Sequence, residues 1–238
     1  MSRFASFSSA LLLAAFAALS APALAQGTPA PSGSAAPAPV AASPEATATV
    51  VNKVQAFYDS TGSFSSPFTQ EFFVKSHNVK KNSSGKVLFS KPGKMAWDYD
   101  NPAGNRVVSD GATLKVYEAA NKQMFEQSID KSQYPAALSF LTGTGKLSDA
   151  FTFVMYDGNA MGFPGGQVLV GSPKKETQAY TKVLFYVDSA TSHVRRALIV
   201  DGQGNRNRFD FTDPKVNVPV PADAFVLNPP PGTTILKP

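Results

Sequence analysis

The spacing of apolar residues changes along the chain from a helical period to a period of two. Residues 47–61 read "TATVVNKVQAFYDST". Apolar side chains recur there at helical spacing, with polar residues on the opposite side: Val50, Val54, Phe57 and Tyr58. This pattern predicts one amphipathic helix near the start of the folded region.

After residue 62, short segments alternate between apolar and polar residues. In "KMAWDYD", Met95, Trp97 and Tyr99 share one side of an extended strand, and the residues between them share the other. Turn-forming residues separate the segments, for example at 91–93 and at Asp110-Gly111. The rhythm predicts a mainly β protein with few helices, in which an antiparallel sheet curls toward a barrel or sandwich.

One segment breaks the alternation. Residues 132–147 read "SQYPAALSFLTGTGKL", in which Pro135 suits a first helical turn and Leu138 and Leu141 lie three apart. We expect a short apolar helix over 135–141 that covers the sheet.

The first residues have the form of a secretory signal peptide. Arg3 precedes an apolar run, and small residues, Ala23 and Ala25, occupy the cleavage positions. Cleavage after Ala25 would export the protein. Residues 26–46 are rich in Pro, Ala, Ser and Gly, which indicates a flexible linker, and residues 47–238 suit one domain.

Composition narrows the possible classes of protein. The chain contains no cysteine, so an exported form has neither disulfides nor the acylated cysteine of a bacterial lipoprotein. The formal net charge of +5 is spread without a Lys/Arg block. The charge therefore indicates neither a nucleic-acid stripe nor a membrane-binding patch.

Residues with catalytic or metal-binding chemistry are sparse. The two histidines, His77 and His193, stand in polar, turn-like surroundings without a second ligand at metal spacing, and we interpret both as surface residues. Asp98 and Asp100 share a strand face, which we interpret as solvated. No nucleophile elbow, P-loop or dinucleotide fingerprint occurs. We expect no enzyme, cofactor or metal.

Aromatic residues are numerous on the predicted strands. Eighteen phenylalanines, seven tyrosines and one tryptophan are present, many in single-face rows on the β segments. Two helices are little cover for the apolar face of such a sheet. Either the sheet closes on itself, or part of its concave face remains an apolar cavity under a small lid. Composition leaves both alternatives open.

Several motifs, in order, resemble a known family. Residues 89–123, "FSKPGKMAWDYDNPAGNRVVSDGATLKVYEAANKQ", resemble the signature region of the periplasmic outer-membrane lipoprotein carrier family, LolA. "FTQ" at 68–70 and "FVLNPPPGTTIL" at 225–236 are similar to its patterns upstream and downstream. The likeness spans about residues 47–238.

The resemblance implies an incomplete antiparallel β-barrel that helices cover, enclosing a hydrophobic cavity for lipoprotein acyl chains. The predicted cavity wall comprises Met95, Trp97, Tyr99, Phe72, Phe153, Phe185 and Phe209. The predicted lid comprises Leu138, Phe140 and Leu141. Lys91 stands where the family carries an arginine that helps to hold the lid shut. An ammonium lacks the planar fork of a guanidinium, so we expect looser closure.

The implied function is a periplasmic chaperone that carries acylated lipoproteins from the inner to the outer membrane. The resemblance implies an inner-membrane ABC transporter as donor and an outer-membrane lipoprotein receptor as acceptor; we expect a monomer that binds no nucleic acid. Two alternatives stay open. A similar sheet and lid could sense lipids or peptide in an envelope stress pathway, or the protein could be a structural β-protein without an apolar ligand.

Overall fold

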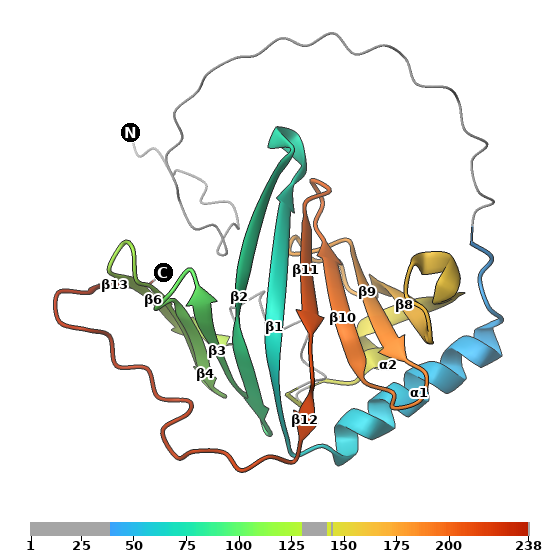
Figure 1. Ribbon diagram of the computed structural model, residues 1–238, viewed down its shortest axis with the longest axis horizontal. Helices are drawn as coiled ribbons and strands as arrows, with labels where there is room; N and C mark the ends of the chain where they lie inside the picture. Colours follow the sequence, from blue (N-terminus) through green and yellow to red (C-terminus); the bar gives the residue numbers. More distant parts are fainter. Residues whose placement is uncertain (1–38, 130–141, 144, 238) are drawn as a thin grey trace, which may run out of the picture.

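One curved antiparallel sheet carries most of the chain (Figure 1). A computed structural model describes residues 39–129, 142–143 and 145–237. In these residues 13 strands form a single sheet in the order β13-β6-β5-β4-β3-β2-β1-β11-β10-β9-β8-β7, with β12 paired to β1. The two ends of this order do not pair with each other, so the sheet is unclosed. The predicted fold class, mainly β with a strongly curved, incomplete barrel, is confirmed.

The strands are short except for the two at the centre of the sheet. Their bounds are β1 Ser63–Val74, β2 Val79–Ser90, β3 Lys94–Asn101, β4 Arg106–Asp110, β5 Thr113–Glu118, β6 Gln123–Ser128, β7 Phe151–Asp157, β8 Gly166–Pro173, β9 Lys182–Asp188, β10 Val194–Val200, β11 Arg206–Phe211, β12 Lys215–Val216 and β13 Thr234–Leu236. Neighbouring strands run antiparallel, except β13, which pairs parallel to β6.

The turns follow the sequence prediction because each contains residues with turn chemistry. Residues 91–93 join β2 to β3, as expected. Between β4 and β5, the carboxylate of Asp110 accepts hydrogen bonds from the backbone N–H groups of Ala112 and Thr113 at 2.9 and 2.8 Å. Gly111 has φ +100°, a conformation that favours glycine. The predicted hairpin at Asp110-Gly111 is confirmed.

The long helix α1, Pro44–Ser60, begins three residues before the expected start. Ser43 is its N-cap, and the Ser43 hydroxyl accepts from the Ala46 N–H at 3.2 Å. Pro44 suits the first helical position because its missing N–H would have no partner there. Ala41 forms an antiparallel bridge with Tyr156 on β7. Residues 41–46, which composition assigned to the linker, therefore belong to the fold.

Helix α1 crosses the inner face of the sheet on the side of β7 to β10 (Figure 1). Val51, Val54 and Tyr58 are buried in one core cluster with inward side chains of the strands. Fully burying a side chain of this size contributes roughly 1.5–3 kcal/mol. None of the described helices is both long enough and apolar enough to span a membrane.

The outer face is covered in part by the C-terminal segment 217–233, which passes around the β3–β6 side before forming β13 (Figure 1). Leu227 and Phe225 from this segment pack with Ala96 and Val108. The guanidinium of Arg106 donates to the carbonyls of Ala224 and Val226, each at 2.8 Å. Ala96, expected on a solvated face with Asp98, is therefore buried, because a segment distant in sequence covers it.

The predicted lid helix, 135–141, lies outside the described residues. The chain enters again at Thr142, whose carbonyl accepts a hydrogen bond from Gly93 N–H at 3.0 Å. A short helix, α2, Leu147–Ala150, then leads into β7. The N–H of Leu147 donates to the side-chain amide of Gln55 on α1 at 2.8 Å.

Tyr58→Phe tests how α1 is held on the sheet. The buried Tyr58 hydroxyl accepts the backbone N–H of Val194 at 3.1 Å. Removing that oxygen leaves a buried donor without its acceptor, which costs about 1–3 kcal/mol. Thermal unfolding should show a lower Tm, by roughly 2–4 °C per kcal/mol for a domain of this size. Tyr156→Phe, at a half-buried position on β7, is the matched control and should leave Tm unchanged.

Candidate functional site

Aromatic rings cover the middle of the inner face. Trp97 on β3 is fully buried and lies against rings from β1, β2 and β11. Its ring centroid is 4.9 Å from that of Phe68, 5.1 Å from Phe209 and 5.7 Å from Phe89. Tilted and edge-on contacts of this kind add stability beyond the buried area. In this structure the wall around Trp97 is packed against itself.

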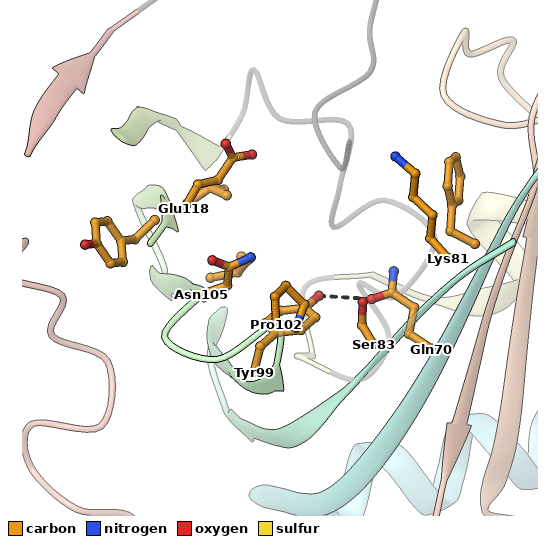
Figure 2. Close-up of a pocket in the computed structure, with 11 residues that line it drawn as sticks. Gln70, Lys81, Ser83, Tyr99, Pro102, Asn105 and Glu118 are labelled. Atoms are coloured by element: carbon orange, nitrogen blue, oxygen red, sulfur yellow. Dashed lines mark hydrogen bonds between the residues drawn. The ribbon is translucent and has the colours of Figure 1, made fainter. Parts of the chain in front are cut away.

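A cavity continues this wall toward the rim of the sheet (Figure 2). Its volume is about 90 Å³. Strands β1 to β5 and their turns contribute its lining: Gln70, Phe72, Lys81, Ser83, Tyr99, Pro102, Asn105, Val107, Val116, Tyr117 and Glu118. Apolar side chains thus meet amides, hydroxyls and two charged groups within one concave space.

The structure places the seven predicted wall residues in two groups. Phe72 and Tyr99 line the cavity. The other five belong to the core cluster or pack against it: Met95, Trp97, Phe153, Phe185 and Phe209. The alternating pattern correctly predicted that these residues lie on the inner face. It does not predict which of them the protein's own side chains cover. Their contact with a ligand stays a prediction.

A chain of polar side chains crosses the inner face between β3 and β11. The Tyr99 hydroxyl donates to Gln70 Oε1 at 3.2 Å, and Gln70 Nε2 donates to Asn207 Oδ1 at 2.9 Å (Figure 2 shows the first bond). Burial raises the pKa of the Tyr99 phenol well above its usual range. The phenol therefore keeps its proton and acts as the donor.

The sequence analysis did not assign Gln70 and Asn207 to the site. The signal for Gln70 was available, because it follows Phe68 by two residues and so shares its strand face. Asn207 lies directly opposite Phe72 in the β1–β11 register, and that pairing joins segments more than 130 residues apart. No local pattern predicts such a pairing.

Lys91 holds the end of α1 rather than any described part of a lid. Its ammonium donates to the backbone carbonyl of Tyr58 and, at 3.4 Å, to that of Asp59. A cation is favourable at a helix C-terminus, where carbonyls lack partners. Its stem packs on Gly143, where a Cβ would stand 2.7 Å from Lys91 Cδ. Burial lowers the pKa of Lys91. The predicted contact with residues 138–141 lies outside the described chain.

The remaining polar residues give little support for catalysis. Asp98 is exposed, as expected, and forms an ion pair with Arg106 at 2.5 Å. His77 is exposed, but His193 is half-buried with its ring centroid 4.4 Å from that of Phe57, so the surface interpretation was wrong for His193. Burial lowers the pKa of His193. Across the described ranges, no three His, Cys, Asp or Glu side chains gather as a metal site would require.

Comparison with known proteins places the chain in a family. A family model described as outer membrane lipoprotein carrier protein LolA matches residues 59–228, well over half of the chain. The chain belongs to the LolA family.

Relatives of this LolA-family chain carry the same description. The outer-membrane lipoprotein carrier protein of Cupriavidus taiwanensis is 28% identical over 193 residues, covering 80% of this chain and 89% of the relative. That of Chromobacterium violaceum is 24% identical over 194 residues, covering 81% and 89%. A crystal structure of a LolA superfamily protein from Nitrosomonas europaea aligns with TM-score 0.42 and 12% identity over 76% of this chain and 97% of that one.

Tyr99→Phe tests the polar chain in this LolA-family protein. The variant loses the bond to Gln70, which at neutral pH costs about 0.5–1.5 kcal/mol. In the wild type, burial raises the pKa of Tyr99 in the folded chain, so above a pH of about 10 the unfolded chain binds fewer protons than the folded chain. The free energy of unfolding therefore falls as pH rises through that value.

The free energy of unfolding of the variant should fall less steeply with rising pH than that of the wild type. Urea unfolding at a series of pH values between about 8 and 11 measures both effects. Equal alkaline slopes for variant and wild type would contradict the assignment of a buried, protonated phenol.

Proposed function

We propose that this protein is a periplasmic chaperone that binds the acyl chains of lipoproteins on its inner face and carries them from the inner to the outer membrane. The observation that supports this most is an unclosed sheet whose inner face carries an aromatic cluster around Trp97 with a cavity beside it. Its family membership and relatives named as outer-membrane lipoprotein carriers support the same role. The predicted N-terminal signal peptide supports export to the periplasm, and the absence of cysteine excludes an acylated-cysteine anchor.

The energetics of acyl burial require partners at both membranes. Burying a methylene contributes ~0.8 kcal/mol, so three chains of roughly fifteen methylenes each are held in a bilayer by on the order of 35 kcal/mol. Non-covalent complexes saturate near about 20 kcal/mol. A carrier cannot extract such cargo unaided. We therefore infer an energised donor, an inner-membrane ABC transporter, and an outer-membrane lipoprotein receptor as acceptor.

The cavity has to enlarge before it can hold cargo. Pockets that enclose a drug-sized ligand have volumes of roughly 300–1,000 Å³, and lipoprotein chains are larger. At about 90 Å³, the cavity beside Tyr99 is far smaller. We infer that acyl chains enter when the predicted lid opens, and that they then contact the row of Met95 and Trp97.

Lys91 is proposed to couple the lid to α1. Its ammonium binds the C-terminal carbonyls of α1, and its stem packs against Gly143, immediately after the predicted lid. A lysine has three donors on a flexible stem, whereas the family's arginine has a planar fork. Closure through Lys91 should therefore be weaker than closure through arginine.

Leu138→Asp tests the proposed lid. A carboxylate on the apolar side of the predicted helix should lower the affinity for an acylated peptide at least tenfold, because binding would desolvate the charge. The affinity is measured by displacement of an environment-sensitive apolar dye with a triacylated peptide. Ser139→Asp adds the same charge at the neighbouring position and is the matched control, which should bind as the wild type does.

Four results would count against the proposal. Unchanged binding of the acylated peptide by Leu138→Asp would contradict the assignment of the lid. If the unacylated peptide displaced the dye as well as the matched acylated peptide does, recognition of the acyl chains would be contradicted. If the purified protein extracted lipoproteins from vesicles without a donor, the energetic argument would be contradicted. If the native protein co-purified with a membrane-spanning regulator instead of with lipoprotein, the sensing role would be favoured.

A further inference from the structure

Two polar side chains face each other on the inner wall beside the aromatic cluster around Trp97. Gln70 on β1 and Ser83 on β2 are directly opposite in the strand register, and both line the cavity (Figure 2). Side chains in such a pair lie about 5 Å apart at Cβ. Gln70 is 7% exposed, although its neighbours along the same face are phenylalanines. A buried amide on an apolar wall is costly unless hydrogen bonds satisfy it.

The network around Gln70 fixes which of its atoms remains available. The buried Tyr99 hydroxyl donates to Gln70 Oε1, and Gln70 Nε2 donates one proton to Asn207 Oδ1. An amide nitrogen carries two donors, so one N–H of Gln70 has no acceptor among the described residues. Tyr99 and Asn207 hold the amide from both sides, which prevents it from rotating.

Ser83 adds a second donor to the same space. Its hydroxyl is half-buried, lines the cavity, and donates to no acceptor within the described chain. The cavity therefore presents one fixed N–H and one rotatable O–H beside the aromatic cluster around Trp97. A ligand that fits both features has hydrocarbon on one side and a hydrogen-bond acceptor immediately beyond it.

We propose that Gln70 and Ser83 bind the ester carbonyls of a diacylglyceryl group, with its hydrocarbon chains directed along the aromatic wall. An ester carbonyl accepts hydrogen bonds at the junction between chain and headgroup, which is where the polar pair meets the wall. Tyr99 and Asn207 act as positioning residues. The inference rests on the proposed acyl binding and specifies which part of the ligand is recognised.

Ester and ether ligands with identical chains isolate this recognition. The ligands are a dipalmitoylglyceryl-cysteine peptide, its dihexadecyl ether analogue and a dipalmitoyl phospholipid, each measured by displacement of an apolar dye. The wild type should bind the ester peptide about three- to tenfold more tightly than the ether, the range that one neutral hydrogen bond supplies. Gln70→Leu and Ser83→Ala should each reduce that ratio toward one.

The ratio of ester to ether affinity distinguishes a lost hydrogen bond from a folding defect, because a partly unfolded variant loses affinity for both ligands equally. Ser83→Ala disturbs the buried network least, and Ser84→Ala, on the other face of the same strand, is its control and should keep the wild-type ratio.

Equal ester and ether binding by the wild type, or an unchanged ratio in both variants, would overturn the ester site while leaving acyl binding intact. Binding of the dipalmitoyl phospholipid but of neither peptide would contradict lipoprotein carriage. Failure of the wild type to bind any of the three ligands would overturn both proposals.

Discussion

An unclosed sheet has to bury its apolar face against something other than itself. Here strands β13 and β7 form the two ends of one curved sheet, and α1 covers the half nearer β7. The rings around Trp97 cover part of the rest by packing on one another. A face covered in this way is stable while water is excluded from it. The proposed carrier function requires that this face can be uncovered without breaking the strand ladder.

The inner face also changes character along its strands. Phe68, Phe209 and Trp97 form an apolar middle, whereas Gln70, Asn207 and the Tyr99 hydroxyl form a hydrogen-bonded line beyond it. Acylated ligands have the same division, with hydrocarbon first and polar linkage after it. On β1 itself Gln70 lies between Phe68 and Phe72, so the division depends on Tyr99 from β3 and Asn207 from β11 as well.

Local pattern predicted the strands, the turns and the inward row of Met95, Trp97 and Tyr99, because these depend on residues close in sequence. It did not predict that Ala96 is buried, because the cover comes from Phe225 and Leu227, far along the chain. Nor did it show that Lys91 would bind the end of α1, a contact made 33 residues away. The resemblance to the LolA family supplied the proposed function and the incomplete barrel. The extent to which the predicted wall is filled in this structure depended on packing that no sequence pattern encodes.

The central claim is that hydrocarbon chains replace protein side chains against the row that contains Trp97, the single tryptophan of the chain. The most direct measurement is quenching of Trp97 fluorescence by acylated peptides with bromine placed along the acyl chains. The account predicts strong quenching at saturation by brominated peptide, and none by the same peptide without bromine. Tight binding of the brominated peptide with unquenched Trp97 would contradict it.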